Sequence, residues 1–208
     1  VLRSKAVLCP GLTVTLLDLK KAERQEWFYK NGIADYLSDK TREFMVLPTQ
    51  PFTISYAEKT EAVDFAVQWL PEVGDVTTES YVNLIPTIQG GTHSNGLRSG
   101  LLDAIKEFCE LRNLLPKGLK LNADDVWDRC CYVISLKLKE PQFSGQTKER
   151  LSSREAAGFV AGVTKDALAL WLNQHTADAE HLANFCINRA QIRSRSVKTV
   201  VRKKIAAG

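Results

Sequence analysis

The stretch that decides how this chain folds is PQFSGQTKERL, residues 141–151, which reads as a strand end, a turn and an exposed polar tip. Ser144 and Gly145 let the backbone turn tightly, because glycine tolerates positive φ. Gln146 then offers two amide donors, and Lys148 offers a compact ammonium group with three. Two such groups on one projecting tip suit a terminal phosphate. The positions that support this tip are Ser144, Gly145 and Thr147.

The segments on either side explain how such a loop is carried. Residues 132–138 alternate between apolar and other side chains, which predicts a strand that ends at the loop. After the loop, Ser152-Ser153-Arg154-Glu155 resembles a capping box, so Ser152 or Ser153 is expected to cap a long helix. That helix has a wide apolar face made by Phe159, Val160, Val163, Ala167, Leu168, Leu170, Trp171 and Leu172.

A second motif, PTIQGGTHSNG, occupies residues 86–96. Its adjacent glycines permit a sharp turn with close approach of another segment. Ser94 or Asn95 is expected to cap a helix that begins near Gly96 and ends before Pro116, while His93 lies on the turn itself. Residues 122–125 then open a further helical turn.

The first half of the chain is predicted to be mixed. Residues 1–8 read as a helix end, 13–19 as a strand and 21–38 as a helix, followed by a linker over 38–42. Three strands are expected after that, at 43–47 with continuation into 52–56, at 62–70 and at 79–85. The turn at 72–75 should join the last two as a hairpin. In the 21–38 helix the expected buried stripe is Trp27, Phe28, Ile33, Tyr36 and Leu37.

Strands gathered before long helices predict an α+β fold. The 208 residues are 44% hydrophobic and 25% charged, as is usual for globular proteins, and no apolar run approaches the ~20 residues that span a bilayer. The five cysteines are odd in number and include no C-x-x-C pair, which argues against a disulfide framework or a zinc site.

Charge is distributed unevenly along the chain. The net charge is +4, but residues 189–208 hold seven basic side chains and no acid, so the rest of the chain carries −3. A basic helix can contact nucleic-acid phosphates without reading sequence, although such runs are often only a solvated helix face. The candidates for lining a passage for DNA are Arg189, Arg193, Arg195, Lys198 and Arg202.

Together these motifs resemble the B subunits of bacterial type IIA DNA topoisomerases. The resemblance rests on the 141–151 loop, on Gly90-Gly91-Thr92-His93 after Asn83-x-Ile85-Pro86-Thr87, and on Asp124-Asp125 before the strand that leads to the loop. It covers essentially the whole chain. The phrases QTKERLSS at 146–153 and VVRKK at 200–204 look more like topoisomerase IV than gyrase.

The resemblance implies two parts. Residues 1–38 correspond to the end of a GHKL ATPase domain. Residues 39–208 correspond to a transducer domain of the ribosomal-S5-domain-2-like type, with a left-handed βαβ crossover. Its long C-terminal helices include a basic terminal helix at about 178–205 that leads to a TOPRIM domain.

The resemblance also implies a function. Lys148 would contact the ATP γ-phosphate with support from Gln146, and the domain would couple nucleotide state to DNA strand passage. The family's catalytic glutamate, magnesium-binding asparagine and glycine-rich lid fall before Val1, so ATP and Mg²⁺ belong to the full-length enzyme. This segment alone is then expected to hold no catalytic residue and no metal site, and to be inactive.

The implied setting is a bacterial cytoplasm, at the nucleoid and away from membranes, in chromosome segregation. The implied partners are duplex DNA, the A subunit in a heterotetramer, and a second copy of the chain through the ATPase region.

Three alternatives remain open on the sequence. The chain could be a non-enzymatic S5-like module that binds RNA or ribosomes through its basic helix. It could be the equivalent domain of another GHKL ATPase, such as a mismatch-repair or chaperone relative. It could also be an inert scaffold, in which case Lys148 is replaceable without consequence.

Overall fold

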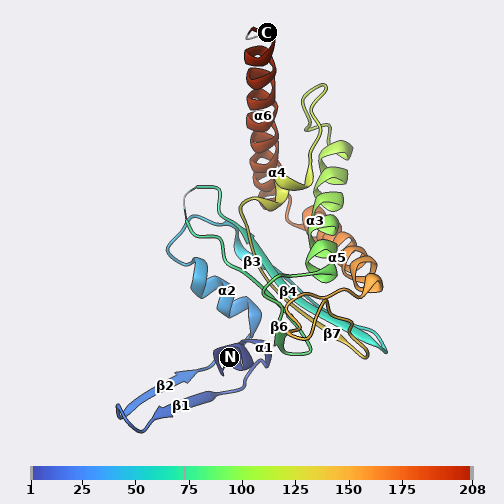
Figure 1. Ribbon diagram of the computed structural model, residues 1–208. Coiled ribbons are helices and arrows are strands. Elements are labelled where there is room, and N and C mark those ends of the chain that lie inside the picture. Colours follow the sequence, from blue (N-terminus) through green and yellow to red (C-terminus); the bar gives the residue numbers. More distant parts are fainter. Residues whose placement is uncertain (1, 73, 207–208) are drawn as a thin grey trace.

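The computed structural model describes the backbone of residues 2–72 and 74–206, and side chains as far as residue 196. The fold is α+β, as the order of elements in the sequence predicts (Figure 1). Its elements are α1 (Leu2–Leu8), β1 (Val14–Asp18), β2 (Glu23–Trp27), α2 (Ile33–Thr41), β3 (Leu47–Ala57), β4 (Glu61–Trp69), β5 (Thr78–Val82), β6 (Ile85–Pro86), α3 (Thr92–Leu111), α4 (Ala123–Trp127), β7 (Cys130–Leu138), α5 (Arg154–Gln174) and α6 (Thr176–Ala206).

A five-stranded sheet with strand order β3-β4-β7-β5-β6 organises the fold. Its neighbouring strands are antiparallel except β5 and β7, which run parallel in adjacent positions. Parallel neighbours need a crossover connection, and here α3 and α4 provide it. The last strand of the sheet therefore lies near its centre.

Both faces of the sheet are covered. On β4, the side chains of Phe65, Val67 and Trp69 join the core formed with α3, α5 and α6, while Ala66 and Leu70 face α1 and α2. Alternate side chains of a strand point to opposite faces, so a strand buried on both sides is apolar at nearly every position. Residues 2–41 thus share a hydrophobic core with the sheet, apart from the β1–β2 ribbon, which extends away from it (Figure 1).

The predicted helix over 21–38 is wrong in its first half. Residues 23–27 form β2, which pairs with β1 in register from Glu23 opposite Asp18 to Trp27 opposite Val14. Phe28 is exposed, whereas Tyr36 and Leu37 are buried in α2. The expected linker over 38–42 is mostly the last turn of the same helix, which Thr41 secures through its hydroxyl bond to the Leu37 carbonyl. Strand pairing outweighed the local helical pattern.

The predicted hairpin between the second and third strands is also wrong. β4 and β5 are not neighbours, because β7 lies between them and pairs with each. The turn at 72–75 is therefore part of a connection that passes around β7. No local signal in the turn reveals this, because the intervening strand comes from some fifty residues later in the sequence.

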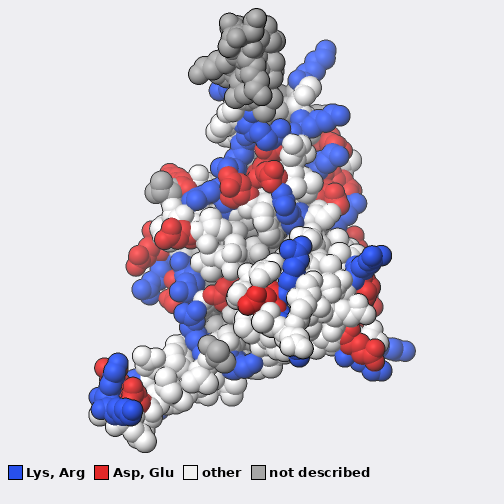
Figure 2. All heavy atoms as spheres, viewed as in Figure 1, with Lys and Arg blue, Asp and Glu red and all other residues white. Residues whose placement is uncertain are grey.

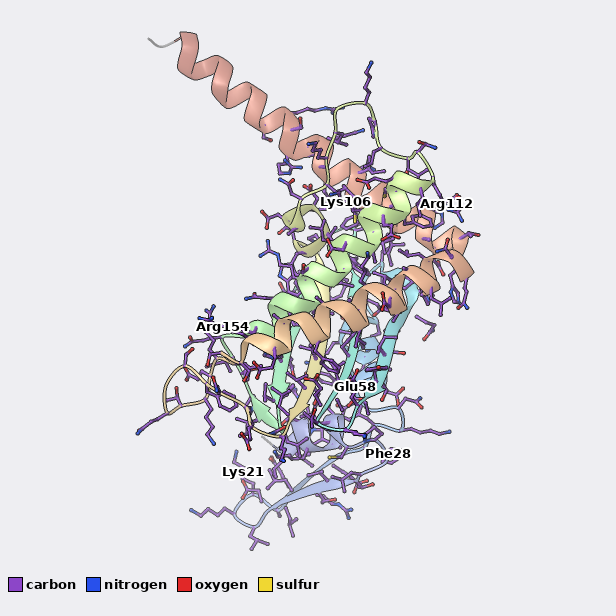
Figure 3. The ribbon with its side chains drawn as sticks, turned by 90° about the vertical axis from the view of Figure 1, so that its right-hand side faces the viewer. Lys21, Phe28, Glu58, Lys106, Arg112 and Arg154 are labelled. Carbon is purple, nitrogen blue, oxygen red and sulfur yellow. The ribbon has the colours of Figure 1, made fainter. Side chains whose placement is uncertain are left out.

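The long helices pack closely and set the outline of the molecule. α3 and α5 lie side by side (Figure 3), with Gly96 close to Ala157 and Gly100 close to Ala161 and Thr164. α6 continues away from the body at the end opposite the N-terminus (Figure 1). Cys109, Cys130, Cys131 and Cys186 are buried free thiols, and Cys9 is half-buried and free.

Candidate functional site

The loop at 141–151 is carried by the most enclosed strand of the sheet. β7 is buried along its first seven residues and pairs with β4 over its whole length, from Cys130 to Leu138. Its parallel neighbour β5 covers the other edge between Tyr132 and Leu136. Because such a strand cannot shift without breaking two ladders of hydrogen bonds, it gives the loop a rigid support.

Backbone hydrogen bonds close the base of the loop. The Ser144 amide donates to the Arg150 carbonyl at 2.9 Å, and the Ser152 amide donates to the Gln142 carbonyl at 2.8 Å. The Gln142 amide donates to Oγ of Ser153 at 2.8 Å. Ser153 is indeed the N-cap of α5, but its side chain makes no capping bond because the loop uses it, so the predicted capping box is wrong.

The tip of the loop presents the predicted phosphate-contacting residues to solvent. Gln146, Thr147 and Lys148 are exposed, and Gly145 takes φ 91° to make the turn. Lys148 itself is left-handed at φ 56°, an uncommon conformation for a residue with a side chain. Its Nζ lies 5.9 Å from the centre of the Phe143 ring, and no ion pair involves it within residues 2–72 and 74–196.

The glycine turn lies directly against this loop. Gly90 and Gly91 take φ 64° and 139°, as the sequence predicts for a sharp turn, and Gly91 forms a parallel bridge with Leu151. Helix α3 begins at Thr92 with Gly91 as its N-cap, so the expected caps Ser94 and Asn95 lie inside the helix. The sequence reasoning missed that the two motifs touch, and two adjacent glycines were the available signal for a close approach.

His93 is buried beneath the turn. Its Nε2 lies 3.3 Å from Oγ1 of Thr87, and its Nδ1 has no hydrogen-bond partner among the described residues. Burial lowers the pKa of His93 to about 4, because the charged imidazolium loses its hydration. His93 is therefore neutral at physiological pH and supports the turn from inside.

The basic helix meets acidic side chains at its base. Arg193 makes a bidentate pair with Asp125, with Nε to Oδ1 and Nη2 to Oδ2 both at 2.8 Å. Those bonds raise the pKa of Arg193. Arg189 pairs with Asp128, and basic and acidic side chains lie intermixed where α6 leaves the body (Figure 2). Arg195 is exposed on the same helix, while the side chains of Lys198 and Arg202 lie outside the described residues.

Other kinds of site are not prominent. No group of three His, Cys, Asp or Glu among the described residues could hold a metal ion. A hollow of about 590 Å³ between α1, α2 and β3 is lined by none of the predicted site residues. Within residues 2–72 and 74–206, no helix combines the length and apolar character needed to cross a membrane.

Comparison with known proteins adds to this geometry. Residues 32–201 match the family model described as DNA gyrase B. Over all 208 residues the chain is 58% identical to the B subunit of DNA topoisomerase 4 from Escherichia coli K12 and to that from Haemophilus influenzae. In each case the chain spans 33% of the relative's length, about a third of the whole protein.

Solved structures agree with the sequence matches. The topoisomerase IV ATP-binding domain of Francisella tularensis, solved with a small-molecule inhibitor, superposes with a TM-score of 0.80 at 39% identity. That match covers 92% of this chain and 52% of the other. The 43K ATPase domain of Thermus thermophilus gyrase B, solved with an aminocoumarin, gives 0.83 at 25% identity, covering 95% of this chain and 53% of that one.

Proposed function

Because this chain belongs to the DNA gyrase B family, we propose that it is the coupling segment of an ATP-dependent type II DNA topoisomerase of the topoisomerase IV kind. The observation that carries the proposal is the geometry of Lys148. Its ammonium group sits on an exposed tip, without an acidic partner in the described chain, on a loop anchored to the buried strand β7. In this role Lys148 contacts the γ-phosphate of ATP and Gln146 adds an amide donor.

The energy of one such contact suits a switch. A hydrogen bond to a charged group contributes about 1.5–3 kcal/mol net, which favours the ATP-bound arrangement roughly ten- to hundredfold. Phosphate release removes the contact, so the loop, β7 and α5 are free to take up a second arrangement. The proposed output is a movement of the long helices toward the site where DNA is cut and passed.

The domain assignment is part of the same proposal. We infer that residues 1–38 end a GHKL ATPase domain and that 39–208 form an S5-like transducer domain with a left-handed crossover. The parallel neighbours β5 and β7, joined through α3, supply the crossover itself. Since α1 and α2 share a core with the sheet, movements of the ATPase end reach the sheet through direct packing.

ATP hydrolysis requires more than these residues. Magnesium would accompany ATP in the full-length enzyme, but the described residues do not form a site for it, since no cluster of suitable ligands is present. We therefore expect residues 1–208 alone to be inactive. The names of the bacterial relatives support a cytoplasmic enzyme that assembles with an A subunit and dimerises through its ATPase region.

Duplex DNA is the proposed partner of α6, through phosphate contacts that weaken with salt. The structure modifies the sequence-based set, because Arg189 and Arg193 are already paired with Asp128 and Asp125. Their charge is partly neutralised at the base of the helix. Contact with DNA is therefore expected to depend more on the exposed part of the helix that begins at Arg195.

The test is Lys148→Ala in the full-length subunit assembled with its A subunit. ATP turnover is expected to fall tenfold or more and DNA relaxation to fall with it, because the phosphate loses a charge-assisted contact. Lys139→Ala is the matched control, since Lys139 is an exposed lysine at the start of the same loop. Equal turnover by the Lys148 variant and the control would refute the sensor role and leave the chain a passive scaffold.

A further inference from the structure

The second limb of the loop, residues 149–151, runs along the turn at 89–92 and is bonded to it at successive positions. The Gln89 amide donates to the Glu149 carbonyl at 3.0 Å, and the Leu151 amide donates to the Gly90 carbonyl at 3.1 Å. The Thr92 amide donates to the Leu151 carbonyl at 3.2 Å. The loop is therefore held at a third point, besides the end of β7 and the start of α5.

Gly91 makes this approach possible. A Cβ at Gly91 would lie 2.4 Å from the Leu151 carbonyl oxygen and 2.6 Å from its nitrogen, which no real contact allows. The φ of 139° at Gly91 also excludes most side chains. The turn and the limb thus fit together at backbone distance, which fixes the position of the limb.

A side-chain contact completes the connection next to Lys148. Nε2 of Gln89 donates to Oε2 of Glu149 at 2.7 Å, on the exposed side of the turn. Glu149 is consequently held by its backbone carbonyl and by its carboxylate at the same time. Because Glu149 follows Lys148 directly, this double attachment restricts where the lysine backbone can go, and it engages the nearest carboxylate away from the ammonium group.

We propose that Gln89 is a positioning residue for Lys148, acting through Glu149, and that this contact sets the reach of the lysine toward a terminal phosphate. The inference rests on the proposed contact between Lys148 and the γ-phosphate. It also assigns a route for the signal. Because the turn opens α3, and α3 packs along α5, a displaced loop moves both helices and not β7 alone.

The experiment uses the full-length subunit with its A subunit and compares Gln89→Glu, Glu149→Gln and the double variant. Gln89→Glu sets two carboxylates against each other, so kcat/KM for ATP is expected to fall about three- to tenfold, the size of one net hydrogen bond. Glu149→Gln should be near wild type, since a glutamine oxygen still accepts the bond. The double variant should recover, because the amide introduced at position 149 can donate to the carboxylate introduced at position 89.

Gln142→Glu is the matched control, an identical charge change at an exposed glutamine on the first limb. Melting temperatures are measured for every variant. If Gln89→Glu melts lower than the control, Gln89→Ala replaces it, because it removes the hydrogen bond without adding charge. Gln89→Glu is also combined with Lys148→Ala, where no further loss of kcat/KM is expected.

The outcomes separate the two proposals. If Lys148→Ala itself changes nothing, the sensor role falls and this inference falls with it. If Lys148→Ala reduces turnover but Gln89→Glu behaves as the control does, only the positioning role of Gln89 is overturned. An equal loss from Gln89→Glu with and without Lys148, or no recovery in the double variant, also overturns it.

Discussion

His93 shows how much a single buried residue contributes to the support of the loop. Ser80 donates to the Thr87 carbonyl at 2.7 Å, and the two hydroxyl groups lie 2.8 Å apart. Thr87 in turn meets His93, whose side chain is fully buried. This polar chain ties β5 to the first turn of α3 beneath Gly90 and Gly91. It can hold together only while the imidazole stays neutral.

Acidification is therefore expected to weaken the fold through His93. The unfolded chain takes up a proton near pH 6.5, whereas folded His93 resists until about pH 4. The free energy of unfolding should thus fall as the pH drops through this window, by about 3 kcal/mol at its lower end. Urea unfolding at several pH values measures it, with His93→Gln as reference. If wild type and variant lose stability in parallel, His93 does not carry the effect.

At the scale of elements, the α3–α5 pair depends on small residues at its crossing. A Cβ at Gly100 would lie 2.6 Å from the Ala161 carbonyl oxygen and 2.6 Å from Cβ of Thr164. Gly162 is also helical, yet nothing lies within 4 Å of the position its Cβ would take. The same residue type thus has opposite meanings on the two helices, which sequence alone does not distinguish.

Alanine at these two glycines should consequently act in opposite directions. Gly100→Ala is expected to cost about 1–3 kcal/mol, because the helices must separate to admit a methyl group. Gly162→Ala should stabilise by about 0.5–1 kcal/mol, since alanine favours the helix and meets no obstacle. Chemical denaturation of the two variants gives both values. A stabilising Gly100→Ala would contradict the close packing.

At the scale of the whole molecule, two contacts join its ends to the central sheet. At the N-terminal end, Tyr36 of α2 and Tyr81 of β5 both donate to Glu79 at 2.5 Å, and this bonding together with burial raises the pKa of each tyrosine. At the other end, Asp125 caps α4 through the Asn122 amide at 2.7 Å and also binds Arg193 of α6. One carboxylate therefore fixes where the long helix leaves the body.

Asp125→Ala should weaken that attachment more than any change at its neighbour. The loss of a cap and of a paired arginine is expected to cost about 2–3 kcal/mol of unfolding free energy. Asp124→Ala is the control, since its carboxylate is 76% exposed and its pair with Arg98 is worth about 1 kcal/mol at most. Thermal and chemical unfolding compare them. Equal losses in the two variants would show that α6 is anchored elsewhere.

The sequence by itself determined the α+β class, most strands and helices, the turn at Gly90 and Gly91, and the exposed tip with Gln146 and Lys148. These follow from local causes, namely alternation, helical spacing and the freedom of glycine. Only the tertiary structure decided that residues 23–27 pair as a strand, that β7 separates β4 from β5, and that Ser153 serves the loop. It alone placed Gln89 against Glu149, and Arg189 and Arg193 against acids. Those contacts join residues up to about seventy positions apart, and no local pattern encodes such pairings.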